Sequence, residues 1–203
     1  KGVYTGDAEE ALAACVSTAN QRRYEGIGEY IDLGYIPAEA NSTSVSNTLE
    51  YAYDDWCIAM LAKHLGKEDV YQTFLKRSEN WKNMFDKSIG FMRPRLKDGS
   101  FKKEFDVLNT HGQGFIEGNT WNYSLYVPHN PEALMQTMGG EKRFVSYLDS
   151  LFTMHLPDEF FANTEDITRE GIIGNYVHGN EPAHHVAYLY NITKQPWKKQ
   201  ERI

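Results

Sequence analysis

Apolar side chains recur with a helical period along most of the chain. The strongest pattern begins at Ser44 and ends at Gly66, and its apolar members lie three or four positions apart on one stripe. These members are Val45, Leu49, Ala52, Trp56, Ala59 and Met60. Residues 68–85 carry a second apolar pattern of this kind, so the two segments together predict a helical hairpin.

Start and stop signals delimit the other predicted helices. Asp7 is placed to cap a helix over residues 8–19, with Glu10 three positions on in capping-box spacing. Asn130, followed by a proline, is placed to cap a later one. The remaining helical patterns cover 24–34, 130–140, 141–152 and 180–193. With seven or eight helices in total, the sequence predicts an all-α fold.

Two long stretches, 86–116 and about 153–177, show little periodicity, and the first contains turn signals compatible with a hairpin. Loops of this length in compact domains are usually functional. An (α/α)6 toroid of antiparallel helical hairpins needs twelve helices. The chain is therefore expected to be either part of such a toroid, with long loops, or a smaller helical array. Residues 1–203 are expected to form a single helical domain.

The composition narrows the class of protein. The chain has 203 residues, 41% hydrophobic and 24% charged, which is typical of a globular domain. A net charge of −7 without a basic run argues against nucleic acid as a partner. No apolar run is long enough for a membrane span, and the first residues do not form a signal peptide. Cys15 and Cys57 are predicted to be buried thiols, although a disulfide between them stays open.

The segment EGNTW, residues 117–121, is the first candidate for chemistry. A general acid sits at a fixed position and is partly desolvated, which raises its pKa, and Glu117 between glycines suits that task. Asn119 is placed to hydrogen-bond a hydroxyl, and Trp121 to stack on an apolar ring face. The plainer interpretation is a solvated Glu near a helix start.

The segment HGNEPAHH, residues 178–185, is the second candidate. Its histidine spacing differs from the zinc motif in which two imidazoles lie four residues apart on a helix. Oxygen atoms of Asn180 and Glu181 suit a hard cation such as calcium better. The plainer interpretation is an ordinary helix cap.

Two adjacent carboxylates, Asp54 and Asp55, form the third candidate, within a predicted helix. They suit sugar-hydroxyl binding, and Arg93 and Arg95 are candidate bidentate partners for them. The plainer interpretation is that one carboxylate is exposed and the other forms an ion pair.

Four segments in this order resemble the catalytic domain of glycoside hydrolase family 92, a family of bacterial exo-acting α-mannosidases. They are SVSNTLEYAYDDWCIAMLAK, GFMRPR, EGNTWNYSLYVPHN and GNYVHGNEPAHHVAYLYNITKQPWKKQ. The resemblance covers nearly the whole chain from about residue 20 onward. It implies an (α/α)6 catalytic domain packed on an N-terminal β-sandwich, and calcium-dependent hydrolysis of α-mannosides with inversion. It also implies a mannose-containing oligosaccharide, such as an α-1,2-linked N-glycan or mannan, as substrate, and a secreted or periplasmic location.

The same resemblance implies roles for individual residues. Glu117 falls on the family's general acid. His178, Asn180 and Glu181 fall on a motif that contributes to the sugar and calcium site, with Asn180 and Glu181 as candidate Ca²⁺ ligands and His178 and Glu181 as candidate sugar contacts. The other expected pocket residues are Asp54, Asp55, Arg93, Asn119 and Trp121.

The chain also departs from the family pattern. The family's general base lies in a later Gly-Asn-Asp-x-Gly segment, which does not follow Trp197 here, and the β-sandwich is missing too. An inverting glycosidase needs both carboxyl groups, roughly 6.5–9.5 Å apart. The chain is therefore expected to be a fragment that carries the acid without the base, inactive in isolation.

Two other classes of function stay open on the sequence. One is an (α/α)-toroid glycosidase of another specificity, acting on glucosides or uronides. The other is a non-catalytic protein, either a helical-repeat interaction module or a carbohydrate-binding remnant. Calcium-dependent turnover of mannosides would distinguish the family 92 mannosidase from all of these alternatives.

Overall fold

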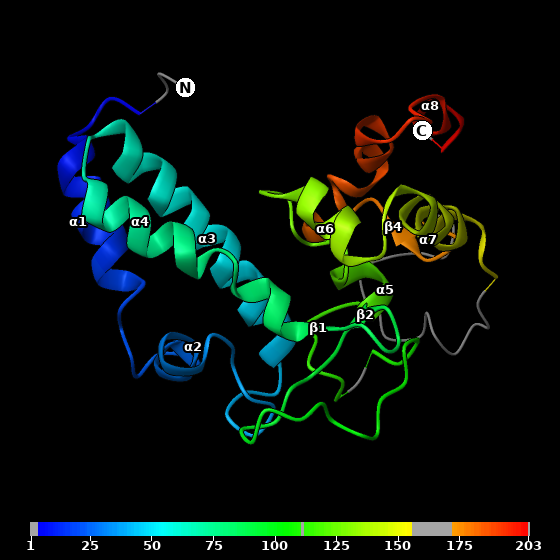
Figure 1. Cartoon of the computed structure of the whole chain (residues 1–203), viewed down its shortest axis with the longest axis horizontal. Coiled ribbons are helices and arrows are strands. Elements are labelled where there is room, and N and C mark those ends of the chain that lie inside the picture. The colour runs from blue at the N-terminus through cyan, green and yellow to red at the C-terminus, as the bar shows by residue number, and fades with distance from the viewer. Residues whose placement is uncertain (1–3, 111, 156–171, 203) are drawn as a thin grey trace. The chain divides into compact units, whose positions relative to one another are not determined.

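The computed structural model describes residues 4–110, 112–155 and 172–202 (Figure 1). The described residues divide into two compact units. Unit 1 comprises residues up to 84 together with 94–102, and unit 2 comprises 85–93 together with the residues from 103 on.

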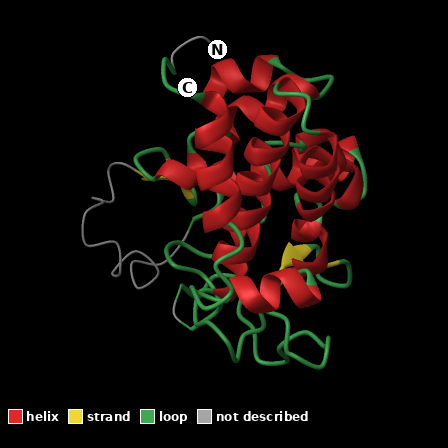
Figure 2. Cartoon of the chain, turned by 90° about the vertical axis from the view of Figure 1, so that its left-hand side faces the viewer, coloured by secondary structure: helices red, strands yellow, loops and turns green. Residues whose placement is uncertain are grey.

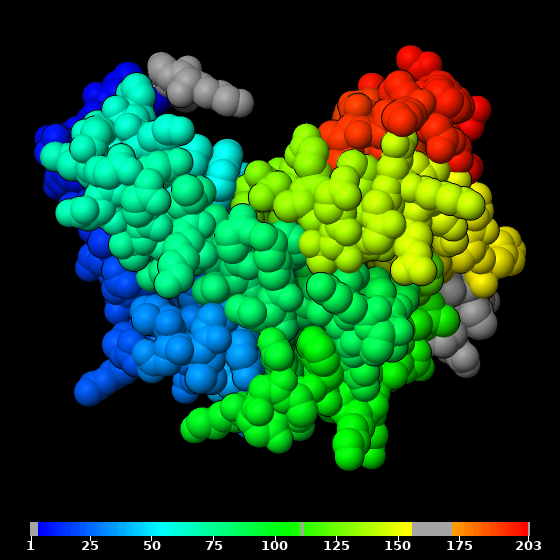
Figure 3. Space-filling view, viewed as in Figure 1, coloured from blue at the N-terminus to red at the C-terminus, as the bar shows by residue number. Residues whose placement is uncertain are grey.

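Unit 1 is a helical hairpin with a third helix packed on it. Helices α3 (Ser44–His64) and α4 (Glu68–Arg77) form the hairpin, and α1 (Ala8–Thr18) packs against α3. Figure 3 shows one face of this packing, with α1 in blue beside the cyan hairpin. The core between the three helices consists of Leu12, Ile58, Ala59, Ala62 and Phe74. The predicted hairpin is therefore confirmed.

Local signals set the ends of these helices as the sequence predicted. Asp7 Oδ1 accepts hydrogen bonds from the backbone N of Glu9 (2.8 Å) and of Glu10 (3.1 Å), which caps α1. Helix α2 (Ile27–Leu33) ends at Gly34, whose φ of 78° is the left-handed conformation that favours glycine.

The predicted helix over 68–85 is too long. Helix α4 ends at Arg77, and the chain continues as the 3-10 helix η1 (Asn80–Met84). In unit 2, β1 (Phe85–Asp86) then pairs with β2 (Phe91–Met92), with Phe85 opposite Met92. The apolar residues Trp81, Met84 and Phe85 are buried as the pattern implied, but Trp81 and Met84 lie in the 3-10 helix and Phe85 lies in a strand. Burial alone does not distinguish these backbones.

Unit 2 combines short helices with two small hairpins, and strands are a minor part of the described chain (Figure 2). Its helices are α5 (Thr120–Tyr123), α6 (Pro131–Thr137), α7 (Glu141–Thr153) and α8 (Trp197–Arg202), with 3-10 helices η4 (Glu181–Ala183) and η5 (Val186–Ile192). Strand β3 (Ile172–Ile173) pairs antiparallel with β4 (Tyr176–Val177). The core includes Phe144, Leu148 and Phe152 of α7, and Phe152 contacts the rings of Tyr176 and Tyr190.

Two predictions in unit 2 are wrong. Residues 180–193 form η4 and η5 instead of one α-helix, and α8 was not predicted. Pro182 lies within η4 and removes one backbone donor, and α8 is too short for a period to show. The cap at Asn130 is confirmed, since its Oδ1 accepts from the Ala133 backbone N at 3.2 Å.

The all-α class is confirmed, since helices dominate the described residues. The prediction of buried cysteines is wrong, because Cys15 and Cys57 are both exposed and line a pocket within unit 1. None of the helices in the described ranges is both long enough and apolar enough to cross a membrane.

Candidate active site

The loop that carries Glu117 is shaped by close contacts between its own polar groups. Gly118 has a φ of 60°, and a Cβ at this position would lie 2.7 Å from Oδ1 of Asn122. That oxygen accepts a hydrogen bond from the backbone N of Asn119 at 3.1 Å. Gly118 is therefore required for a tight turn, because a side chain there would displace the Asn122 amide.

Asn119 caps α5 and is almost fully buried, with 3% of its surface exposed. Its Oδ1 accepts from the backbone N of Trp121 (3.0 Å) and from Nδ2 of Asn175 (3.2 Å). Its Nδ2 donates to the Leu108 carbonyl at 3.3 Å. These contacts occupy the amide that the sequence assigned to a sugar hydroxyl, and they make Asn119 a residue that holds the loop.

Glu117 itself is exposed. Its Oε1 lies 3.5 Å from the Tyr123 hydroxyl, which is long for a hydrogen bond. The carboxyl group of Glu117 is therefore solvated in this chain, as in the plainer interpretation of a Glu near a helix start. The buried ring of Tyr123, which stacks on Phe115 at 5.7 Å, forms the nearest fixed wall of the loop.

Trp121 belongs to an aromatic cluster. Its ring meets the ring of Phe91 edge to face, with centroids 4.9 Å apart, and the ring of Tyr147 at 4.6 Å. The Tyr147 hydroxyl donates to the Trp121 carbonyl at 3.0 Å. The indole is half-buried and held in place by these contacts.

The segment with His178, Asn180 and Glu181 lies next to the Glu117 loop. Element η4, which begins at Glu181, packs directly against α5, which follows Glu117 and Asn119. His178 and Glu181 are exposed. The His178 Nδ1 lies 2.5 Å from the Tyr176 hydroxyl, and its ring lies 5.5 Å from that of His184. Two segments that are about 60 residues apart in sequence thus meet in unit 2.

Asn180 offers the clearest sign of a ligand at this place. It does not cap η4 with its side chain, and its Oδ1 is buried without a hydrogen-bond partner among the described residues. A buried amide oxygen in that state costs free energy unless a ligand satisfies it. The Asn180 oxygen and the neighbouring Glu181 carboxylate are of the kind that Ca²⁺ prefers, so these residues fit that cation. Among the described residues, no three His, Cys, Asp or Glu side chains lie close enough together to hold a metal ion.

Arg93 forms an ion pair with Asp86, and not with Asp54 or Asp55 as the sequence predicted. Its Nη1 donates to Asp86 Oδ2 at 2.9 Å, and its Nη2 donates to the Lys103 carbonyl at 3.0 Å. Burial acts to raise the pKa of Asp86, but hydrogen bonds from Ser88 and Arg93 together keep that pKa below its usual value. Arg95 donates to the carbonyls of Gly99 and Asn83 within unit 1. The expected pairing of these arginines with Asp54 and Asp55 is wrong.

Asp55 pairs with Arg77 instead. Its Oδ2 accepts from Arg77 Nε at 3.0 Å and from the Tyr30 hydroxyl at 2.7 Å, and only 1% of the residue is exposed. Burial raises its pKa to about 6, although Arg77 and Tyr30 act in the opposite direction. The plainer interpretation, one exposed carboxylate and one ion pair, is what the contacts show. Asp55 therefore joins α3 to α4 and is closed to a sugar hydroxyl.

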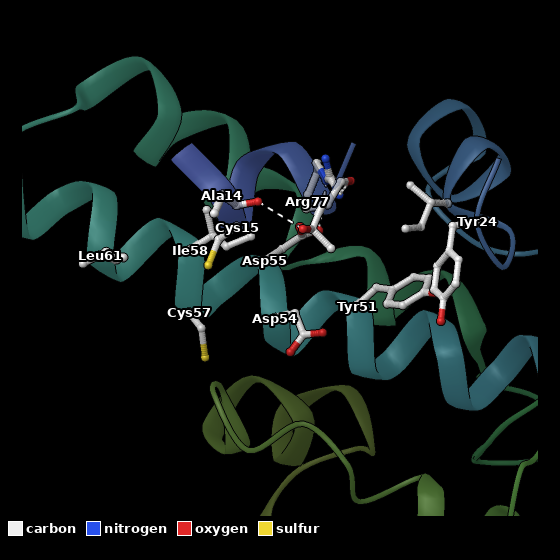
Figure 4. Close-up of a pocket in the computed structure, with 13 residues that line it drawn as sticks. Ala14, Cys15, Tyr24, Tyr51, Asp54, Asp55, Cys57, Ile58, Leu61 and Arg77 are labelled. Atoms are coloured by element: carbon white, nitrogen blue, oxygen red, sulfur yellow. Dashed lines mark hydrogen bonds and ion pairs between the residues drawn. The ribbon is translucent and has the colours of Figure 1, made fainter. Parts of the chain in front are cut away.

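Asp54 points away from this ion pair, as Figure 4 shows. It is exposed on the wall of a pocket of about 590 Å³ within unit 1, where partial desolvation raises its pKa. Other lining residues include Tyr24, Tyr51 and the two cysteines. Asp54 is thus accessible to a ligand.

The structure gathers Arg93, Glu117, Asn119, Trp121, His178, Asn180 and Glu181 in unit 2, and Asp54 and Asp55 in unit 1. Sequence reasoning missed Arg77, Asn122 and Asn175. Arg77 lies in the last turn of a helix, where a basic residue is ordinary. Asn122 lies three residues after Asn119 in capping-box spacing, which was a usable signal.

The fold and these motifs define a helical glycoside hydrolase catalytic domain. A model of the glycosyl hydrolase family 92 catalytic domain matches residues 1–203. The chain belongs to this family.

Solved structures support the assignment. The family GH92 α-mannosidase BT3965 from Bacteroides thetaiotaomicron is 41% identical, with a TM-score of 0.87 over 98% of this chain and 25% of that one. The family GH92 inverting mannosidase BT2199 from Bacteroides thetaiotaomicron VPI-5482 is 34% identical, with a TM-score of 0.84 over 98% of this chain and 29% of that one. An "uncharacterized secreted glycosidase" of Arthroderma benhamiae is 27% identical over 84% of this chain and 23% of its own length. The chain thus spans about a quarter of these relatives.

Proposed function

We propose that the complete protein that contains this chain is a calcium-dependent, inverting, exo-acting α-mannosidase, and that Glu117 is its general acid. The observation that carries the proposal is the contact between α5 and η4, which places the Glu117 loop beside the Asn180–Glu181 segment. The relatives add weight: BT2199 is described as an inverting mannosidase, and BT3965 has been solved in complex with mannoimidazole.

In this proposal each residue has a separate task. Glu117 donates its proton to the glycosidic oxygen as the bond to the leaving sugar breaks. Its exposed carboxyl group reaches that oxygen, and the bound sugar supplies the desolvation that the chain does not. Trp121, held by Phe91 and Tyr147, presents an apolar surface to the ring. His178 and Arg93 of unit 2 are proposed sugar contacts, while Asn119 and Asp55 each hold the structure in place within their own units.

Asn180 and Glu181 would hold Ca²⁺, which supplies a positive charge that binds sugar hydroxyls. The general base is proposed to come from the remainder of the protein, since the chain spans about a quarter of BT3965. Secretion and a preference for α-1,2-linked mannose in N-glycans or mannans belong to the same proposal.

The test is mannose release from α-1,2-mannobiose by the complete protein, with calcium and with a chelator. Release that the chelator abolishes and added calcium restores supports the proposal. Release that is indifferent to chelation contradicts the role of calcium. Absence of release from α-1,2-, α-1,3-, α-1,4- and α-1,6-linked mannobiose contradicts the mannosidase assignment. A parallel panel of glucosides and uronides identifies a toroid glycosidase of other specificity.

A further inference from the structure

Asn175 lies at the turn of the β3–β4 hairpin, three residues before His178, and only 6% of its surface is exposed. Its side chain Nδ2 donates to Asn119 Oδ1 at 3.2 Å. Its carbonyl accepts from Asn122 Nδ2 at 2.7 Å. One residue of the hairpin is therefore bonded both to the N-cap of α5 and to a residue within it, just after Glu117.

The turn is itself fixed to α7. The backbone N of Asn175 donates to the Leu151 carbonyl at 2.8 Å. Gly174 has a φ of 65°, and a Cβ there would lie 2.3 Å from the same carbonyl. The turn therefore rests on the backbone of α7, the longest helix among the described residues of unit 2, which gives Asn175 a rigid support.

The three amides of Asn119, Asn122 and Asn175 form one network. Asn119 Oδ1 and Asn122 Oδ1 accept bonds within the loop, while Asn122 Nδ2 and Asn175 Nδ2 make the bonds between the loop and the hairpin. A buried network of this kind is rigid when its donors and acceptors are satisfied. Strand β4 then leads directly to His178, Asn180 and Glu181.

We propose that Asn175 is a positioning residue that couples the general-acid loop to the calcium-binding segment, through its bonds to Asn119 and Asn122. A shift of the acid loop is then transmitted to Asn180 and Glu181, and occupation of Asn180 by a cation restrains Glu117. The inference rests on the proposed function. It adds a coupling between the two parts of that site.

Two variants remove one bond each in the complete protein. Asn175→Ala removes the donor to Asn119 and keeps the backbone carbonyl. Asn122→Asp keeps the oxygen that accepts from the Asn119 backbone and removes the donor to Asn175. Asn191→Asp, at an exposed position of η5, is the matched control for the added charge.

The first measurement compares an α-mannobiose with a dinitrophenyl α-mannoside, whose leaving group needs no proton. A misplacement of about 1 Å costs on the order of 10²-fold in rate. We expect kcat to fall about 10- to 100-fold on the disaccharide and much less on the aryl mannoside. The second is calorimetric titration of calcium into the metal-free protein without substrate, where coupling of the usual size weakens binding about 5-fold or more. Asn191→Asp should behave as wild type in both.

A larger loss of kcat on the disaccharide than on the aryl mannoside, together with weaker calcium binding, supports the coupling. Equal losses on the two substrates, or unchanged calcium affinity in both variants, overturn it. Glu117→Gln serves as the reference in the same assay. If Glu117→Gln shows the leaving-group dependence and the asparagine variants do not, the coupling fails and the proposed function stands. If Glu117→Gln matches wild type on the disaccharide, Glu117 is not the general acid, and that part of the proposed function fails.

Discussion

Gly118 and Asn122 are in such close contact that a single methyl group on the glycine would lie 2.7 Å from the asparagine Oδ1. The same oxygen accepts a hydrogen bond from the Asn119 backbone. The shape of the Glu117 loop therefore depends on the absence of a side chain at residue 118, and this dependence gives the first prediction.

Gly118→Ala should lower kcat on an α-mannobiose about 10-fold or more. Residue 118 has a left-handed φ of 60°, a conformation that costs a non-glycine residue about 1–2 kcal/mol. The added methyl group also displaces the Asn122 amide, which shifts the loop that carries Glu117. Gly90→Ala is the control, because Gly90 has a φ of 78° and a Cβ there meets nothing within 4 Å. Equal loss of kcat in both variants would mean that backbone strain alone explains the effect.

Arg77→Met should destabilise the α3–α4 hairpin by about 3–5 kcal/mol at neutral pH. The change leaves the Asp55 carboxylate buried without its cation, and breaking a buried pair from one side has about this cost. Hydrogen exchange of the α3 and α4 backbone amides in the complete protein measures the local opening free energy. Lys76→Met, in the same turn and exposed, should change protection little. Wild-type protection in Arg77→Met would show that the pair contributes nothing.

The raised pKa of Asp55 predicts that the opening free energy of the α3–α4 hairpin depends on pH. Its folded pKa of about 6 lies above the ordinary value of 3.8, so the folded chain binds this proton more tightly than the unfolded chain does. The resulting stabilisation, about 3 kcal/mol, is complete below about pH 4 and is lost as the pH rises to about 6. Asp55→Asn removes this titration, so its opening free energy should improve relative to wild type as pH rises through this window. A difference between the two proteins that is constant from pH 4 to 7 would contradict the raised pKa.

Asn180→Ala should weaken calcium binding by about 10-fold or more, because the variant lacks the buried Oδ1 that has no partner among the described residues. Calorimetric titration of the metal-free protein measures this directly, and the calcium-induced rise in melting temperature should shrink in parallel. Asn191→Ala is the exposed control. Full calcium affinity in Asn180→Ala would remove Asn180 from the set of ligands.

The sequence predicted helices correctly where an apolar stripe or a capping signal was clear. The helix after Asp7 has its side-chain cap, and the hairpin of α3 and α4 follows the apolar stripe although neither of its helices has a side-chain cap. It failed where burial was right and the backbone was not, as at Trp81 and Phe85, because a buried apolar residue fits a helix, a 3-10 turn or a strand equally well.

The candidate site shows a similar division. The motifs predicted roles for Glu117 and Asn180, which stay predictions. They did not indicate which arginine would pair with Asp55, because Arg77 is 22 residues away and the pairing depends on how α3 and α4 pack. The proposed role of Asn175 depends on its contact with Asn119, more than 50 residues earlier in the chain, and no local sequence pattern predicts such a contact.

The measurement that tests the central claim most directly compares Glu117→Gln with wild type in the turnover of α-1,2-mannobiose by the complete, calcium-loaded protein. Glu132→Gln is the control, since it makes the same change at an exposed position of α6. If Glu117 is the general acid, its variant loses about 10²–10⁴ in kcat, and the control keeps wild-type turnover. Wild-type turnover by Glu117→Gln would show that another residue protonates the leaving sugar.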